Sequence, residues 1–430
     1  MTDEILIQLA QRYGTPTYVF DTKALRERVR RIREILGDQV HLCYSIKANP
    51  FLIPAMLQEV EHLEVCSPGE LTICERLKVP MEAVVYSGVN KEPVDVEQAV
   101  RKDHVGVCTA ESVRHVRLLE KAAAASDASD AEDHGSRNAG GRLPVLLRLN
   151  AGAQFGMSRA DLLSVIANRE QYPHLEIVGI HYFVGTQRKN KQLHQQKEEL
   201  QMLKDLYEQV EREYGFRLKR LEYGPGLPVP LFAGDDYSDT LAPVKELAPF
   251  LQEAAQWAEL TVEAGRFYAT ECGYYLTKAM DCKTSDENVH YCILDGGIHH
   301  VNYLGQIMGM KEPVIRHYRG NGDPDAVLET AVLHRIPDDG EDAEPWALCG
   351  SLCTTNDDLV RSRRMAEPRP GDVLVFENIG AYSVTEGIYL FLSRKMPRIV
   401  LYNDISDIRL VRDFVDTSVW NTADIGTLEG

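Results

Sequence analysis

The chain has 430 residues, of which 44% are hydrophobic, and this length exceeds what one compact core normally organises, so we expect two domains. A formal net charge of -18 at pH 7 opposes binding to nucleic acid phosphates and to anionic lipid. No apolar run reaches the roughly 18 residues of a membrane span, and no secretion signal is evident, which favours a cytosolic protein. Nine cysteines without repeated close spacing favour reduced thiols over a disulfide framework or a zinc site.

Short β-rich runs alternate with helical patterns between residues 41 and 266. We count eight such runs, at residues 41–47, 63–66, 83–87, 104–108, 144–150, 176–185, 218–223 and 260–263. Helices are expected between them, as at residues 68–77 and 189–214. Eight parallel strands with intervening helices predict a closed α/β barrel rather than an open doubly wound sheet.

Beyond residue 267 the pattern changes to strands without regular helices, which predicts an all-β domain of the sandwich or barrel type. The predicted strands include residues 274–283, 290–295, 346–349, 373–377 and 398–402. An early run at 16–20 is not needed for the barrel and is expected to join this β domain. We therefore assign residues 22–266 to the barrel, and residues 1–21 and 267–430 to the β domain.

Two further segments are expected to be loops. Residues 122–142 are small, polar and of low complexity, a composition typical of a flexible insertion in the barrel. The acidic stretch at 338–344 is typical of a solvated loop.

Lys47 ends the first run, within the segment YSIKANP. Active sites of α/β barrels lie at the carboxyl ends of the strands, and apolar surroundings there favour a neutral amine that can form a Schiff base. The alternative is a lysine whose ammonium group simply extends to solvent from a strand end.

Two glycine-containing loops and one carboxylate follow the last strands of the predicted barrel. Gly224 and Gly226 follow the seventh run and Gly265 with Arg266 follows the eighth, where barrels commonly bind phosphate. Turn formation is the alternative role for each glycine. Glu263 lies in the same predicted pocket, where a buried carboxylate needs a cationic partner or must be protonated. A pyridinium nitrogen would serve, and a structural salt bridge with Arg266 or Arg148 is the alternative.

Several short motifs occur in the order found in one enzyme family: GTPTYVFD, YSIKANP, VCSPGEL, HYFVGTQ, EYGPGL, EAGR, CGSLC and GAY. On these motifs, from residue 14 to 383, the chain resembles the ornithine/diaminopimelate decarboxylases. These fold type III enzymes use pyridoxal 5'-phosphate and join an alanine-racemase-like barrel to a carboxy-terminal β domain. The segments GTQ, DGGIHH and CTTNDDL are most similar to the butirosin-type branch, which decarboxylates glutamyl groups tethered to an acyl carrier protein.

The resemblance implies roles for individual residues. Lys47 would form the Schiff base with the cofactor, and Glu263 would meet its pyridine nitrogen. The phosphate would be surrounded by Gly224, Gly226, Gly265, Arg266 and Tyr382. Arg148 and Glu64 would lie near the phenolic side of the ring and the lysine. Cys353 would reach into the site of the partner subunit of a homodimer and act there in catalysis.

The departures from the family pattern concern the cofactor ring and the substrate. Phe183 stands where the family places a histidine that stacks on the ring, while His181 lies two residues earlier on the same side of the strand. Pro225 removes one backbone amide from the phosphate loop. Thr354 replaces the acid that recognises a distal ammonium group, so diamine production is disfavoured.

We therefore expect a decarboxylase of an amino-acid-type substrate, free or carrier-bound, in antibiotic or siderophore biosynthesis, with no metal. His299 and His300 are candidate substrate contacts, or else exposed loop residues. A diaminopimelate or ornithine/lysine decarboxylase is the alternative enzyme. A racemase is disfavoured, because such racemases place an arginine where Glu263 stands, and a non-catalytic cofactor-binding regulator is the alternative of another class.

Overall fold

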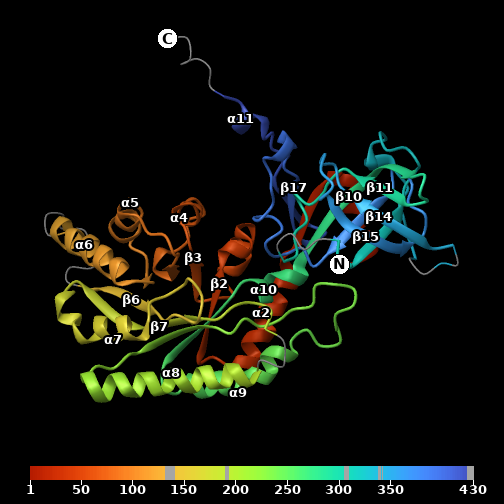
Figure 1. Ribbon diagram of the computed structural model, residues 1–430. Coiled ribbons are helices and arrows are strands. Elements are labelled where there is room, and N and C mark those ends of the chain that lie inside the picture. Colours follow the sequence, from red (N-terminus) through yellow and green to blue (C-terminus); the bar gives the residue numbers. More distant parts are fainter. Residues whose placement is uncertain (131–140, 189–192, 305–308, 338–339, 341, 424–430) are drawn as a thin grey trace, which may run out of the picture. The chain divides into compact units, whose positions relative to one another are not determined.

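The computed structural model describes residues 1–130, 141–188, 193–304, 309–337, 340 and 342–423 (Figure 1). The chain forms two compact units. The barrel unit comprises Arg26–Val229 and Asp239–Tyr268, and the β unit comprises Met1–Leu25, Pro230–Ser238 and Ala269–Gly430. Each unit is therefore assembled from segments that are separate in the sequence.

The barrel unit contains a closed barrel of eight parallel strands that follow one another in chain order, with helices on its outside (Figure 1). Its strands are β2 (Val40–Ser45), β3 (His62–Val65), β4 (Val84–Tyr86), β5 (Val107–Ala110), β6 (Leu143–Arg148), β7 (Leu175–Phe183), β8 (Arg220–Gly224) and β9 (Glu259–Ala264). The predicted barrel is confirmed, and parallel strands bring every carboxyl end to one rim. The first strand is shorter than expected, because Ile46–Ala48 forms a 3-10 turn that contains Lys47.

The helices of the barrel unit begin with recognisable sequence signals. They are α2 (Thr22–Leu36), α3 (Ile53–Met56), α4 (Pro68–Arg76), α5 (Pro93–Glu97), α6 (Val113–Asp130), α7 (Arg159–Ala167), α8 (Leu193–Tyr214), α9 (Ala242–Ala254) and α10 (Arg266–Ala269). In α4 the Ser67 hydroxyl accepts a hydrogen bond from the Glu70 amide, and the Glu70 carboxylate accepts one from the Cys66 amide. This reciprocal cap, with Pro68 in the first turn, fixes the segment directly after β3.

The prediction of a flexible insertion from residue 122 is wrong for its first part. Residues 122–130 continue α6, and Ala122 and Ala123 are buried. Alanine has the highest helix propensity, so this small-residue composition extends the helix. Residues 131–140 lie outside the described residues.

The β unit is organised around a ten-stranded sheet in the order β13-β12-β16-β10-β1-β17-β18, with β11, β14 and β15 joined through β10. Its strands are β1 (Thr17–Asp21), β10 (Gly273–Thr284), β11 (His290–Leu294), β12 (Ile315–Arg319), β13 (His334–Ile336), β14 (Glu344–Cys349), β15 (Asp358–Met365), β16 (Val373–Glu377), β17 (Arg398–Asp404) and β18 (Asp407–Arg412). The early run at 16–20 corresponds to β1, which pairs with β10 and β17. Glu344 begins β14, so the expected acidic loop ends before it, and residues 338, 339 and 341 lie outside the described residues.

Two short helices complete the β unit, α1 (Asp3–Tyr13) and α11 (Ser418–Asn421). Helix α1 buries Leu6 and Leu9 in a core cluster with Val19, Val375 and Val400 from the sheet. Within the described parts of both units, no helix combines the length and apolar character that crossing a bilayer requires.

Candidate active site

Lys47 lies at the rim of the barrel, in the first turn after β2. Its Nζ donates a hydrogen bond to Glu64 Oε2 at 2.5 Å, and it lies 3.6 Å from Glu263 Oε1. The Lys47 side chain is 37% exposed, whereas those of Glu64 and Glu263 are 2% and 5% exposed. One partly accessible amine therefore faces two buried carboxylates contributed by β3 and β9.

Glu263 is fixed by three different partners. Besides Lys47, Ser45 Oγ donates to its Oε1 at 2.7 Å, and His181 Nε2 lies 3.0 Å from its Oε2. Burial acts to raise the pKa of Glu263, but the charge on Lys47 and the hydrogen bond from His181 outweigh burial and hold that pKa well below its usual range. Glu263 is therefore an anion at neutral pH, held in one orientation inside the barrel.

His181, on β7, contacts the Glu263 carboxylate. The sequence alone did not identify this partner. The His181 side chain is 1% exposed, and because a carboxylate anion only accepts, its Nε2 must carry the proton. Phe183 ends the same strand two residues later, which places it on the same side of β7.

Glu222 on β8 is a buried acid that sequence reasoning missed. It is 3% exposed, and within the described chain its Oε1 has no hydrogen-bond partner. Burial, together with the negative charges of Glu263 and Glu64, raises the pKa of Glu222 well above its ordinary value. Glu222 is thus a neutral carboxylic acid, and its position two residues before Gly224 was the available signal that it faces the barrel interior.

Arg148, at the end of β6, has Glu111 as its ion-pair partner, at 2.6 Å. Its guanidinium lies over the Phe155 ring, 4.8 Å from the ring centroid, and the second Glu111 oxygen accepts the Gly156 amide at 3.2 Å. The alternative of a salt bridge between Arg148 and Glu263 is therefore wrong, because Glu111 neutralises the arginine.

The loop after β8 approaches the end of β7 so closely that two glycines are required there. A Cβ on Gly224 would lie 2.2 Å from Phe183 Cδ2. Gly226 has a φ of +65°, and a Cβ there would lie 2.0 Å from the Gly185 carbonyl oxygen. Arg266, directly after Gly265, begins α10 at the end of β9. The structure therefore brings Gly224, Gly226 and Gly265 to the rim that carries Lys47.

The other expected site residues belong to the β unit. Cys353 is exposed and lies with Thr354 in the turn between β14 and β15. The Asp357 carboxylate, 2% exposed, accepts the backbone amides of Ile298 and Leu352, both at 2.7 Å. It thus ties the Cys353 turn to the segment before His299, a role that no sequence pattern indicated.

His299 and His300 are each 1% exposed, so the alternative that they are exposed loop residues is wrong. Their ring centroids lie 3.7 Å apart, and the Tyr275 hydroxyl lies 2.7 Å from His300 Nδ1. Burial lowers the pKa of His299 to about 4 and holds the pKa of His300 well below its usual value, so both rings are neutral at pH 7. Tyr382 has a φ of +69°, an uncommon conformation for a bulky residue and one often found at functional sites.

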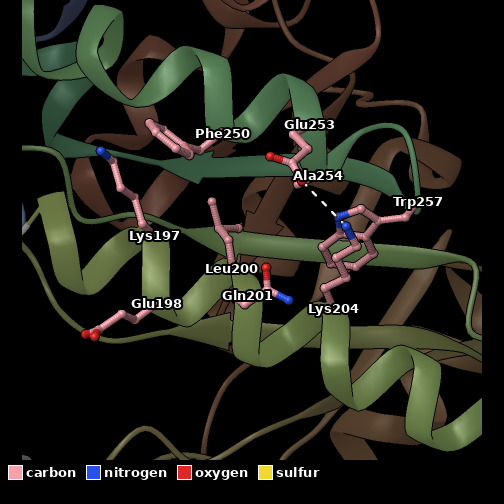
Figure 2. Close-up of a pocket in the computed structure, with 9 residues that line it drawn as sticks. All are labelled: Lys197, Glu198, Leu200, Gln201, Lys204, Phe250, Glu253, Ala254 and Trp257. Carbon is pink, nitrogen blue, oxygen red and sulfur yellow. Dashed lines mark hydrogen bonds and ion pairs between the residues drawn. The ribbon is translucent and has the colours of Figure 1, made fainter.

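The barrel unit has two other features that resemble binding sites. Glu64, His181 and Glu263 place three ligand atoms within 4.8 Å of one another, as a metal site would require, but the Lys47 amine already supplies a cation to them. A groove with a volume of about 300 Å³ lies between α8 and α9, and the residues that line it are drawn in Figure 2. In this groove, Lys197 Nζ lies 4.2 Å from the Phe250 ring centroid. This groove contains none of the expected site residues.

Comparison with known proteins identifies related sequences over nearly the whole chain. The family profile described as pyridoxal-dependent decarboxylase, pyridoxal binding domain, matches residues 22–270. The L-glutamyl-(BtrI acyl-carrier protein) decarboxylase of Niallia circulans is 25% identical, covering 90% of this chain and 89% of the relative. The diaminopimelate decarboxylase of Aquifex aeolicus is 23% identical, covering 95% of this chain and 91% of the relative.

A solved structure shares the fold. The crystal structure of diaminopimelate decarboxylase from M. jannaschii, in complex with L-lysine, superposes with a TM-score of 0.79 at 20% identity. The superposition covers 98% of this chain and 94% of that chain. It agrees with a parallel barrel accompanied by a mainly β unit.

Proposed function

Because this chain belongs to the family of pyridoxal-dependent decarboxylases, we propose that it removes the α-carboxylate of an amino acid whose distal end carries no free ammonium group. A glutamyl group tethered to an acyl carrier protein is the substrate we favour. The observation that carries this proposal is Thr354, which stands directly after Cys353 where the related diamine-forming enzymes have an acid.

The barrel residues fit pyridoxal 5'-phosphate. Lys47 offers a partly exposed amine to hold the aldehyde, and the Glu263 anion suits a protonated pyridine nitrogen. Gly224 and Gly226 have no side chains, so their backbone amides would be accessible to a phosphate. Arg266, at the end of β9, would add positive charge. Phe183 would pack on the ring face where relatives use histidine.

The cofactor supplies an electron sink for the electron pair that the substrate retains when carbon dioxide leaves. The protein holds protons and charges around it. Glu64 Oε2, at 2.5 Å from Lys47 Nζ, is placed to take up and return the proton of the amine. His181 Nε2 and Ser45 Oγ keep Glu263 oriented and ionised. Its negative charge would therefore stay directed at the pyridine nitrogen during turnover.

Thr354 bears on the choice of substrate through charge. A free distal ammonium group that enters a protein site without a counter-charge loses hydration energy, and a threonine hydroxyl does not replace a carboxylate in this respect. A tethered or amidated distal end avoids this cost. The relative from Niallia circulans, whose name specifies a carrier-bound glutamyl substrate, supports the same choice. We therefore place the reaction in specialised biosynthesis, of an antibiotic or a siderophore.

Release of carbon dioxide from five substrates tests the proposal: diaminopimelate, ornithine, lysine, arginine and carrier-bound glutamate. We expect the highest kcat/KM with carrier-bound glutamate, and Thr354→Asp should shift the ratio toward ornithine and lysine because it restores the counter-charge. Lys47→Ala, inactive on every substrate, is the control. A wild-type preference for diaminopimelate or ornithine would contradict the proposal.

We also propose a homodimer with shared sites, in which the exposed Cys353 of one subunit completes the site that contains Lys47 of the other. Lys47→Ala and Cys353→Ala should each be nearly inactive alone. In a random mixture half of the dimers contain one variant subunit of each kind, and each such dimer has one intact site. Activity should recover to about a quarter of wild type. No recovery, with subunit exchange verified by mass, would show that both residues act within one subunit.

A further inference from the structure

Two cysteines of the β unit face each other across an antiparallel hairpin. Cys282 on β10 lies directly opposite Cys292 on β11. The register shift in this pair of strands falls between Ala279 and Asp281, so it does not interrupt the pairing at the cysteines. All nine cysteines of the chain are free thiols in the structure.

The hydrogen bonds of the hairpin show which kind of pair this is. The Ser285 amide donates to the Val289 carbonyl at 2.9 Å, which makes these residues a hydrogen-bonded pair at the hairpin end. Because hydrogen-bonded and non-hydrogen-bonded pairs alternate along an antiparallel ladder, Cys282 and Cys292 form a non-hydrogen-bonded pair. Such pairs have Cα atoms about 4.5 Å apart, within the range of about 4.4–6.8 Å that a disulfide requires.

The two thiols differ in access and in acidity. Cys282 is partly exposed, whereas Cys292 is completely buried. A hydrogen bond from the Cys292 thiol lowers the pKa of Cys282, and the same bond, together with burial, raises the pKa of Cys292 well above its usual value. The thiolate is the nucleophile in disulfide exchange, so Cys282 is suited to attack and Cys292 to resolve.

Cys349 on the neighbouring strand β14 is engaged elsewhere. Its register partner on β11 is Ile293, and its Sγ donates to Asp358 Oδ1 at 3.3 Å. Burial raises the pKa of Cys349 to about 12, which suppresses its thiolate. It is therefore a poor competitor for the reaction of the pair.

We propose that Cys282 and Cys292 form a redox-active dithiol that low-molecular-weight disulfides convert to a cross-strand disulfide. The Cys282 thiolate attacks one sulfur of the reagent, forming a mixed disulfide and releasing one thiolate. Cys292 loses its proton and attacks the Cys282 sulfur, which breaks the mixed disulfide and releases the second thiolate. One reagent disulfide is reduced to two thiols, and the protein dithiol is oxidised to one disulfide.

The position of the pair links this chemistry to the rest of the β unit. Strand β11 leads into Asp295 and the segment up to His300, and Asp357 ties that segment to the Cys353 turn. A covalent bond at Cys292 thus constrains the strand from which this segment emerges. This proposal concerns the thiols themselves and does not depend on the substrate of the enzyme.

Oxidised glutathione added to the full-length holoenzyme tests the proposal, with free thiols then blocked by N-ethylmaleimide and peptides identified by mass. The wild type should give a Cys282–Cys292 linked peptide that dithiothreitol removes. Cys292→Ser and Cys292→Ala should both stop at a glutathione adduct on Cys282, and the alanine variant adds no hydroxyl to the buried position. Cys282→Ser should leave Cys292 unmodified, because it is buried. Cys108→Ser, at a buried thiol of the barrel, is the matched control and should behave as wild type.

Two outcomes would overturn the proposal. One is a stable glutathione adduct on Cys282 in the wild type, which would show that Cys292 does not resolve it. The other is an unmodified Cys282 under conditions that label the exposed Cys353.

Discussion

The barrel unit and the β unit hold their expected site residues in different ways. In the barrel, Glu263 is held by side chains that carry charge or donate to charge, namely Lys47, His181 and Ser45. In the β unit, one carboxylate, Asp357, accepts two backbone amides and fixes the turn that carries Cys353. The barrel site is therefore sensitive to the sign and number of charges, and the turn is sensitive to the loss of a backbone anchor.

The barrel also shows that two buried glutamates on neighbouring strands can have opposite charge states. Glu263 has a cation and two hydrogen-bond donors and stays ionised, whereas Glu222 stays neutral because it is buried and lies near the negative charges of Glu263 and Glu64. The pair allows a matched substitution, because glutamine has nearly the same shape as glutamate but cannot carry charge.

The largest effect is expected from Glu263→Gln. Turnover should fall about 1000-fold with the cofactor still bound, because a neutral amide does not stabilise positive charge as the anion does. Steady-state kinetics and the absorbance of bound cofactor measure the two effects. Glu222→Gln is the control and should change turnover little, since Glu222 is already neutral. Equal losses of turnover in Glu263→Gln and Glu222→Gln would contradict the inference that the two glutamates differ in charge.

A smaller effect, on stability, is expected from Asp357→Ala. The free energy of unfolding should decrease by about 3 kcal/mol, because two buried amides lose their acceptor. Urea unfolding measures this change. Asp358→Ala, whose carboxylate accepts from the Cys349 thiol, should cost less. If Asp357→Ala also abolished cofactor binding, the turn that carries Cys353 would affect the barrel site. That result would contradict the separation between a barrel site held by side-chain charges and a turn held by backbone amides.

The smallest effect concerns pH. The raised pKa of Glu222 means that the folded chain keeps a proton which the unfolded chain releases above a pH of about 4.3. The contribution of Glu222 to wild-type stability therefore falls as pH rises from that value toward the folded-state pKa. Because glutamine has no such proton, the stability difference should favour Glu222→Gln increasingly as pH rises above about 4.3, until the raised folded-state pKa is reached. Parallel stability profiles would mean that Glu222 is ionised in the fold.

The sequence predicted the parts of the site that follow from local patterns. Alternating strands and helices located the barrel, and strand ends located Lys47 and Glu263. The sequence could not identify the hydrogen-bond partner of His181. The alternation of side chains along a strand predicts which face of the strand a residue lies on, but it does not predict which atom the side chain contacts. Glu222 was missed although it stands two residues before Gly224 in a strand of the predicted barrel, because glutamate is usually a solvent-exposed residue.

The β unit was harder to predict because its pairings are distant in sequence. Strands β12, β13, β15 and β18 were not expected, since Arg-rich runs such as that of β15 lack a clear apolar alternation. The role of Asp357 depends on amides of Ile298 and Leu352, which only the folded sheet brings to one carboxylate. Conversely, the alanine-rich residues 122–130 were expected to be flexible but extend α6. The high helix propensity of alanine outweighs the low complexity of this segment.

The central position of β1 has a consequence for synthesis on the ribosome. Thr17 pairs with Leu276 on one side and with Arg398 on the other, so β1 gains its first neighbour only when β10 is made and its second only when β17 is made. All eight barrel strands emerge in between. A nascent chain thus exposes an apolar strand with two unpaired edges throughout barrel assembly, which leaves this segment open to pairing with other chains.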